Sequence, residues 1–122
     1  MSTSAVLVIS ISSGADMPRF PPTVTTAELH RLLVRSAHLW LIYVPDVLEV
    51  ATSQIPGSLT TCDEHLLSAL ATQTPMVLYG DSKHSTRAVT LAGRLASQGR
   101  DARWYVGGLE AWIAAGHPVE GA

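Results

Sequence analysis

Residues 80–86 place side chains suited to polar chemistry directly after an apolar run. They are Gly80, Asp81, Ser82, Lys83, His84, Ser85 and Thr86. A helical pattern follows, so the first N–H groups of that helix would point outward at this loop, where such groups can hold an anion. Lys83 and His84 would favour an anion, whereas Asp81 would oppose one. We expect a ligand-binding loop here. The alternative is an ordinary turn in which Ser85 or Thr86 caps the helix and contributes about 1 kcal/mol.

Cys62, the only cysteine of the chain, is the second candidate for chemistry. Thr61 and Glu64 stand in capping-box relation, which predicts Thr61 as an N-cap and puts the thiol in the first helical turn, where the helix dipole lowers the pKa of a cysteine. His65 would lie nearby on the same helix face. Two interpretations stay open: a reactive thiol, or a partly exposed cysteine with no chemical role.

The remaining residues show no metal or cofactor pattern. A single cysteine excludes an internal disulfide and a thiolate-rich zinc or iron–sulfur site. The histidines, at positions 30, 38, 65, 84 and 117, form no helical pair with an acidic third ligand. Gly107 and Gly108 lack the longer glycine-rich phosphate motifs, so we expect them to serve tight backbone geometry. Trp104 and Trp112 are expected to pack in the core or at its rim.

Composition narrows the class of protein. With 122 residues, 47% of them hydrophobic and 15% charged, the chain can form one globular domain with its own core. The net charge of −2 and a single lysine provide no basic stripe, which argues against a nucleic-acid partner. The apolar segment 5–11 is too short to span a bilayer, and no basic residue precedes it as in a signal peptide. We expect a cytoplasmic protein, with homo-oligomerisation left open.

Helices and strands alternate along the chain. We interpret residues 1–22 as an N-terminal extension, either an extra strand or a loose tail, and residues 23–122 as the domain. A capping box formed by Thr25 and Glu28 opens the first helix. Strands are predicted at residues 38–44, 76–79 and 102–106, and further helices at 61–73, 86–99 and 107–116, with a helical turn within 46–54 and a tight turn at 55–58. This order indicates an α/β fold with a mainly parallel sheet.

Three blocks of residues 24–119 resemble, in order, the rhodanese-like domain family. The first is similar to a strand, an acidic turn, a short helix and an isoleucine-proline-glycine turn: LIYVPDVLEVATSQIPGS. The second is similar to a strand, the active-site loop and the following helix: VLYGDSKHSTRAVTLAGRLASQG. The third is similar to the family's ending, with paired glycines and a tryptophan: WYVGGLEAWIAAGHPV. The resemblance implies a small parallel sheet flanked by helices on both faces.

The resemblance also implies a reaction for which this loop has no nucleophile. In active members, a cysteine after the second strand takes a sulfur atom from a donor such as thiosulfate and carries it as a persulfide, aided by the loop N–H groups. This chain has Gly80 at that position. Other family positions differ too: Tyr43 replaces an aspartate, Pro45 an arginine, Gln54 a histidine, Lys83 a glycine, Ser85 an arginine and Thr86 a serine.

These observations predict a catalytically inactive rhodanese-like binding or regulatory module. Its residual pocket at residues 80–86, slightly roomier without the cysteine side chain, would take a small anion, a partner's peptide or a partner's cysteine. The alternative is a divergent sulfurtransferase or other thiol-dependent enzyme that uses Cys62. The phosphatases of this fold fit less well, because Gly80 and Ser85 provide neither their cysteine nor their arginine. A purely structural partner domain also stays open.

Overall fold

The computed structural model describes residues 20–35, 38–47, 53–70 and 73–121. Its centre is a five-stranded parallel sheet with the strand order β2-β7-β6-β3-β5. In that order the strands are Thr23–Val24, Ala102–Tyr105, Met76–Tyr79, Trp40–Tyr43 and Leu59–Thr60. Two further strands, β4 (Ser53–Gln54) and β8 (Glu120–Gly121), pair antiparallel with each other. The predicted α/β class with a mainly parallel sheet is confirmed.

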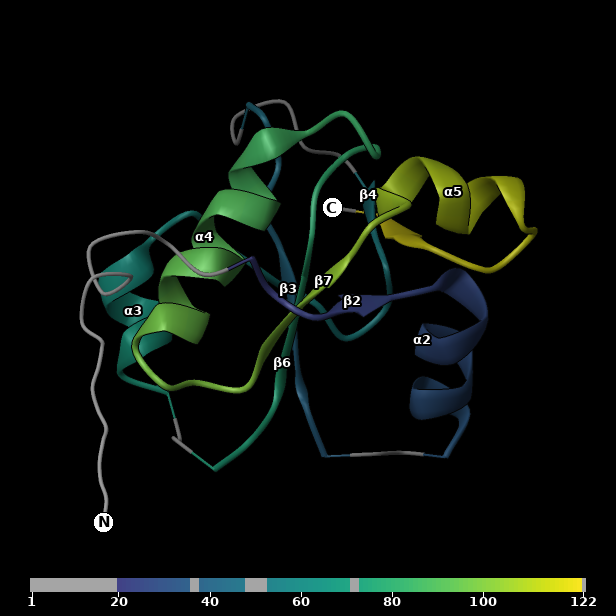
Figure 1. Ribbon diagram of the computed structural model, residues 1–122. Helices are drawn as coiled ribbons and strands as arrows, with labels where there is room; N and C mark the ends of the chain where they lie inside the picture. Colours follow the sequence, from purple (N-terminus) through teal and green to yellow (C-terminus); the bar gives the residue numbers. More distant parts are fainter. Residues whose placement is uncertain (1–19, 36–37, 48–52, 71–72, 122) are drawn as a thin grey trace, which may run out of the picture.

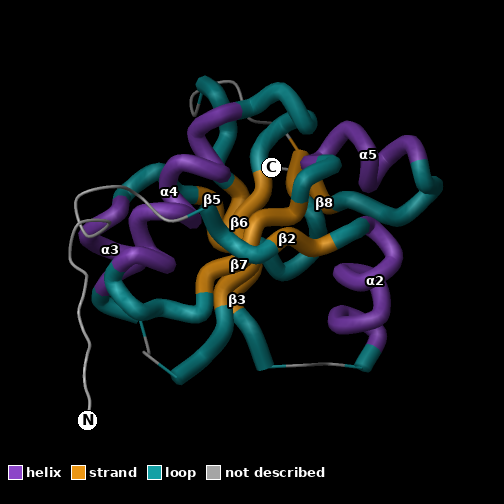
Figure 2. The backbone as a smooth tube through the Cα atoms, in the orientation of Figure 1, coloured by secondary structure: helices purple, strands orange, loops and turns teal. Residues whose placement is uncertain are grey.

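Helices cover both faces of the sheet, which gives three layers (Figure 1). The helices α2 (Thr26–Val34) and α5 (Gly108–Ala114) lie on one side, and α3 (Glu64–Ser68) and α4 (Thr86–Ser97) lie on the other. Figure 2 shows the strands as a central layer between these two pairs. No helix in the described segments is long and apolar enough to cross a membrane.

The central strands bury side chains on both faces, which explains their continuous apolar runs. Side chains of β3 and β6 alternate between the two cores because successive residues of a strand point to opposite faces. One core, beneath α2 and α5, receives Leu41, Tyr43, Val77 and Tyr79. The other core, beneath α3 and α4, receives Ile42, Val44, Met76 and Leu78.

Local sequence signals place two helix ends correctly. The capping box at the start of α2 is present, with the Thr25 hydroxyl accepting from the Glu28 N–H and the Glu28 carboxylate accepting from the Thr25 N–H. After α4, Gly99 has φ +85°, and its N–H donates to the Ala96 carbonyl at 3.0 Å. This left-handed glycine follows the C-cap Gln98 and ends the helix, at the end of the predicted range 86–99.

The predicted start of α3 is wrong. Asp63, not Thr61, is the N-cap, and its Oδ1 accepts from the His65 N–H at 2.9 Å. The Thr61 N–H instead donates to the Tyr43 carbonyl at 3.0 Å, which continues the pairing of β5 with β3 past Thr60. The chain therefore leaves the sheet later than the capping-box pattern predicts.

Two other predicted segments fall partly outside the described residues. These are the N-terminal extension, except for residues 20–22, and the helical turn within 46–54, of which residues 48–52 are not described and residues 53–54 form β4. The end of the extension continues the pairing of β2 with β7, because the Pro22 carbonyl accepts from the Trp104 N–H at 2.8 Å. The Phe20 ring meets the Trp104 ring edge-on, with centroids 6.0 Å apart.

Candidate functional site

The parallel sheet brings the two candidate sites to one edge. Residues 80–86 follow β6, Cys62 follows β5, and residues 44–47 follow β3. The carboxyl ends of these three strands face the same way because they pair in parallel. Ligands of open α/β sheets bind at this edge, so the topology agrees with the location of the predicted site.

Gly80 lies buried directly after β6, and its neighbour occupies the space that a side chain would need. A Cβ added to Gly80 would lie 2.6 Å from Ser85 Cβ and 3.2 Å from Ser85 Oγ. The expectation of a slightly roomier pocket at Gly80 is therefore wrong, because Ser85 packs against the glycine.

The Ser85 hydroxyl forms hydrogen bonds within the loop and to Asp46, and does not cap α4. Ser85 is the N-cap residue of α4 and is 5% exposed, but its side chain makes no bond to the helix N–H groups. The Ser85 hydroxyl accepts from the Ser82 N–H at 3.2 Å and donates to Asp46 Oδ2 at 3.1 Å. The predicted cap by Ser85 fails for this reason, and α4 begins without a side-chain cap.

Asp81 turns its carboxylate towards the strand end rather than towards a ligand. The carboxylate accepts from the Tyr43 hydroxyl and, at 2.9 Å, from the Asp46 N–H. Burial, and then the bond to Asp81, raise the pKa of Tyr43 above its ordinary value. The carboxylates of Asp46 and Asp81 thus both contact loop or strand-end groups, which disfavours an anion at this point. Lys83 and His84 are exposed.

The glycine pair at the start of α5, Gly107 and Gly108, holds the loop from the other side. The N–H groups of Leu109 and Glu110 donate to the carbonyls of Gly80 and Asp81, both at 2.9 Å. Gly108 has φ +68°, and a Cβ there would lie 2.8 Å from the Gly80 carbonyl oxygen. The glycine pair therefore permits a close backbone approach, in agreement with the geometric role that its sequence predicts.

Tyr79 and Gln54 serve the turn that follows β4. The Tyr79 hydroxyl accepts from the Ile55 N–H at 2.9 Å and bonds to Ser58 Oγ at 2.7 Å, and burial raises the pKa of Tyr79 to about 12. Gln54 donates to the Ser58 carbonyl at 3.0 Å and to Glu120 Oε2 at 2.7 Å. Both side chains hold the turn in place.

A cavity of about 310 Å³ borders the loop on the side of α3 and α4. We call it the Cys62 cavity; it is lined by Val44, Cys62, Glu64, Thr86, Arg87, Thr90, Leu91 and Arg94. The half-buried Cys62 thiol donates to the Pro45 carbonyl, and Arg87 Nη1 donates to Cys62 Sγ, both at 3.8 Å. Because Cys62 precedes the N-cap Asp63, it lies outside the first helical turn and shares no helix face with His65, contrary to the sequence prediction.

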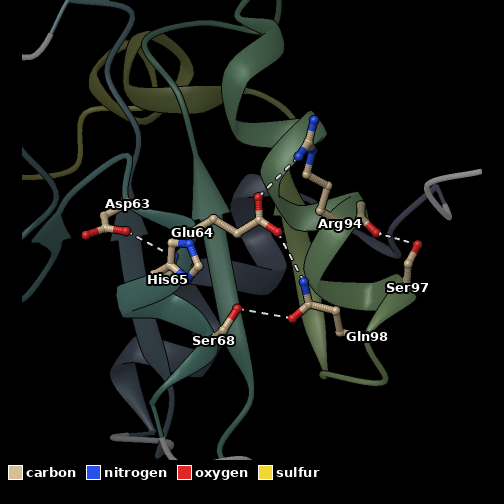
Figure 3. Close-up of polar contacts among 8 residues, drawn as sticks. Asp63, Glu64, His65, Ser68, Arg94, Ser97 and Gln98 are labelled. Carbon is tan, nitrogen blue, oxygen red and sulfur yellow. Dashed lines mark hydrogen bonds and ion pairs between the residues drawn. The ribbon is translucent and has the colours of Figure 1, made fainter.

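Charged side chains on α3 and α4 form one wall of the Cys62 cavity. Glu64 reaches from α3 to Arg94 at 3.4 Å and to Gln98 at 3.1 Å, as Figure 3 shows. Arg87 and Arg94 bring two guanidinium groups to the cavity, against the one carboxylate of Glu64. Sequence reasoning missed these arginines, although their seven-residue spacing, two helical turns, places them on one face of α4.

His30, His117, Trp104 and Trp112 belong to neither site. Among the described residues, no three His, Cys, Asp or Glu side chains gather as metal ligands. His30 and His117 stack on each other with centroids 4.3 Å apart. Trp112 is 2% exposed and its indole N–H donates to the Pro118 carbonyl at 2.8 Å, while Trp104 is half-buried, so both pack as predicted.

Solved structures identify the architecture. A rhodanese-like domain from an Anabaena protein matches with a TM-score of 0.68 and 20% identity, over 83% of this chain and 80% of that chain. A rhodanese-related protein from Thermoplasma volcanium matches with a TM-score of 0.65 and 17% identity, over 81% of this chain and 97% of that chain. The chain has the rhodanese-like fold. No protein-family model and no curated protein matches the sequence.

The rhodanese-like fold also occurs within an enzyme. A thiosulfate sulfurtransferase from Pseudomonas aeruginosa matches with a TM-score of 0.64 and 20% identity, over 82% of this chain but only 20% of that chain. Likeness at this identity establishes the architecture, and the chemistry depends on the residues of this chain. Those residues are a glycine after β6 and a cysteine after β5.

Proposed function

We propose that this chain is a rhodanese-like binding module that does not transfer sulfur through its loop. The observation that carries the proposal is Gly80, which offers no nucleophile and packs against Ser85. A persulfide at this position would need both a side-chain sulfur and the volume that Ser85 fills. The hydrogen bonds of Asp81 and Asp46 add support. They engage polar groups of the loop with other parts of the protein, where an active loop would present such groups to a substrate.

The ligand of this module would enter the Cys62 cavity, where the loop ends at Thr86. The Arg87 and Arg94 guanidinium groups give this cavity a net positive lining, and α4 starts there without a side-chain cap. A small anion, or an acidic or thiol-bearing side chain of a partner, fits this chemistry. The predicted ligand site thereby moves from the centre of the loop to its helical end.

The first test measures sulfur transfer from thiosulfate to cyanide by the purified full chain. We expect a rate equal to that of a heat-treated sample. A rate well above that control would refute the loss of activity. In parallel, an NMR titration with sulfite is expected to shift the amide signals of Thr86 and Arg87 more than those of Lys83 and His84. The opposite order would return the ligand to the centre of the loop.

A second candidate function, thiol chemistry at Cys62, is favoured by the Arg87 contact to its sulfur within a cavity. In this reaction the Cys62 thiol loses its proton to solvent and its sulfur attacks the outer sulfur of thiosulfate. The sulfur–sulfur bond of thiosulfate breaks, sulfite leaves, and a persulfide forms on Cys62. A guanidinium beside the sulfur would stabilise the anionic donor during the attack.

Intact-protein mass spectrometry separates the two functions. The parent chain and Cys62→Ser are incubated with thiosulfate and, separately, with a polysulfide. A one-sulfur adduct that is present in the parent and absent in Cys62→Ser would support the enzyme. Arg87→Gln is the matched variant, because it keeps the thiol and removes the neighbouring guanidinium. No adduct from either donor would exclude the persulfide chemistry and leave the binding module.

A further inference from the structure

A larger cavity lies at the other side of the sheet, between its edge strand β2, the helix α2 and the start of β7. It has a volume of about 450 Å³. We call it the β2 groove; its polar lining is Thr23, Glu28, Arg31, Arg35, Asp101 and Arg103. Figure 1 shows β2 leading directly into α2. These two consecutive elements form two walls of the β2 groove. The groove shares no lining residue with the Cys62 cavity.

The carboxylates of the groove are already engaged. Glu28 belongs to the capping box of α2, and its bonds to Thr25, first that of the backbone N–H, lower the pKa of Glu28 and keep it ionised. Asp101 accepts two bonds from Arg103, from Nε at 3.0 Å and from Nη2 at 3.1 Å. Asp101 is therefore paired with Arg103, while Glu28 bonds to the N-cap residue of its own helix.

The three guanidinium groups of the groove, from Arg31, Arg35 and Arg103, outnumber its two carboxylates, so its net charge is positive. Within the described residues, neither the Arg31 nor the Arg35 guanidinium forms a hydrogen bond or an ion pair, and Arg31 acts on Glu28 only at longer range. Like charges four residues apart on a helix repel by about 0.2–0.5 kcal/mol. Their position near the end of α2 offsets this repulsion through the helix dipole. Arg103, which comes from β7 and bonds to Asp101 through Nε and Nη2, lines the same groove.

The backbone of β2 adds one donor to this groove. The carbonyls of Pro22 and Val24 accept from Trp104 and Val106 of the β7 segment, at 2.8 and 3.4 Å. Because strand residues alternate, the N–H of Thr23 points away from β7, on the side of β2 where the described residues add no further strand. Pro21 and Pro22 have no N–H, so this edge cannot pair with an extended peptide over several residues. A compact ligand fits better than an added strand.

We propose that the β2 groove binds a small anion of the diphosphate class, held by Arg31, Arg35, Arg103 and the Thr23 N–H. Guanidinium groups match phosphate oxygens with two parallel bonds each, and several of them suit a group with many anionic oxygens. The volume falls in the range of small-molecule sites, about 300–1,000 Å³. The diphosphate could be inorganic or part of a nucleotide, since both present the same oxygens.

An NMR titration of the full chain with inorganic pyrophosphate, at constant ionic strength, tests this site. We expect saturable shifts of the Thr23, Arg31 and Arg35 amide signals, and much smaller shifts with sulfate. Arg31→Gln and Arg35→Gln should each raise the dissociation constant about tenfold, because each removes charged hydrogen bonds. Arg35→Lys keeps the positive charge and should lose less affinity for pyrophosphate than Arg35→Gln does. A parallel titration with ADP shows whether the nucleoside adds affinity.

Three results would overturn the proposal. The first is the absence of saturable binding by pyrophosphate or ADP. The second is unchanged affinity in the double variant Arg31→Gln/Arg35→Gln, with its fold verified by circular dichroism. The third is a set of shifts centred on Thr86 and Arg87, together with loss of affinity in Arg87→Gln, which would assign the anion to the Cys62 cavity and leave the proposed function intact.

Discussion

The loop at residues 80–86 and the Cys62 cavity lie at the same edge of the sheet, but they use their polar groups differently. In the loop, the Asp81 carboxylate and the Ser85 hydroxyl each have two partners within the protein. Around the cavity, the contacts of Cys62 measure 3.8 Å and the Glu64–Arg94 pair is partly exposed. Position at the carboxyl edge is therefore not sufficient for a binding site, because polar groups must also have unused bonding capacity.

This difference predicts that changes in the loop cost stability, whereas changes at the cavity affect binding. The largest effect is expected for Gly108→Ala, which places a Cβ 2.8 Å from the Gly80 carbonyl oxygen at a φ of +68°. Strain and overlap together should lower the free energy of unfolding by about 3 kcal/mol, as measured by urea denaturation.

Gly57→Ala is the matched control for Gly108→Ala. Gly57 also has positive φ, +87°, but a Cβ there would meet nothing within 4 Å. Gly57→Ala should lower the free energy of unfolding by about 1 kcal/mol, from backbone strain at positive φ alone. Equal losses for the two variants would mean that the close approach of α5 to the loop does not constrain the loop.

Gly80→Ala tests the packing of Ser85 against the glycine. The added Cβ would lie 2.6 Å from Ser85 Cβ, so we expect a loss of about 2 kcal/mol in the free energy of unfolding. In the double variant Gly80→Ala/Ser85→Gly the overlap is gone, and the two changes should couple favourably by at least about 1 kcal/mol. If Gly80→Ala stabilised the protein, as an unhindered glycine replacement does, the loop would have room for a ligand.

Alkaline pH tests the loop and turn through Tyr43 and Tyr79. Burial raises the pKa of Tyr79 from 10.0 to about 12, and that of Tyr43 also rises, so the folded state binds these protons more tightly than the unfolded state. The stability that these raised pKa values contribute is complete below about pH 10. It is lost as the pH rises through the pKa values of the folded state. We expect unfolding free energies to fall by about 1 kcal/mol per pH unit above pH 10 for Tyr79 alone.

Tyr79→Phe should flatten this alkaline decline, although it also loses the bonds to Ile55 and Ser58 at neutral pH. Phenolate absorbance in the folded protein measures the tyrosine pKa values independently. The buried tyrosines should ionise at a higher pH than free tyrosine does. Ionisation of all tyrosines near the free value, without unfolding, would contradict the burial of Tyr79.

The smallest effect is expected at the cavity wall. Glu64→Gln removes the partner of Arg94, and the pair is partly exposed, so the unfolding free energy should change by less than about 0.5 kcal/mol. The sulfite-induced shifts of Thr86 and Arg87 should increase in the same variant, because a competing carboxylate is gone. A stability loss as large as that of Gly80→Ala would show that this wall is structural.

Prediction from the sequence succeeded where contacts between residues close in the sequence determine the local structure. The capping box of α2 and the glycine that ends α4 involve residues within a few positions of each other, and the buried strands follow from their apolar runs. The start of α3 could not be predicted in this way. Thr61 and Asp63 both suit an N-cap, and the bond from the Thr61 N–H to Tyr43, in another strand, decides between them.

The sequence alone determined that a glycine follows the second buried strand, that one cysteine is present, and that helices alternate with strands. Only the tertiary structure decided what surrounds these residues. Tyr43 and Asp81 are 38 positions apart, and Asp46 and Ser85 are 39 apart. Such pairs form only when β3 and β6 align in the sheet, so their partners depend on strand register rather than on any local pattern. The same folding brings Arg31, Arg35 and Arg103 to one groove.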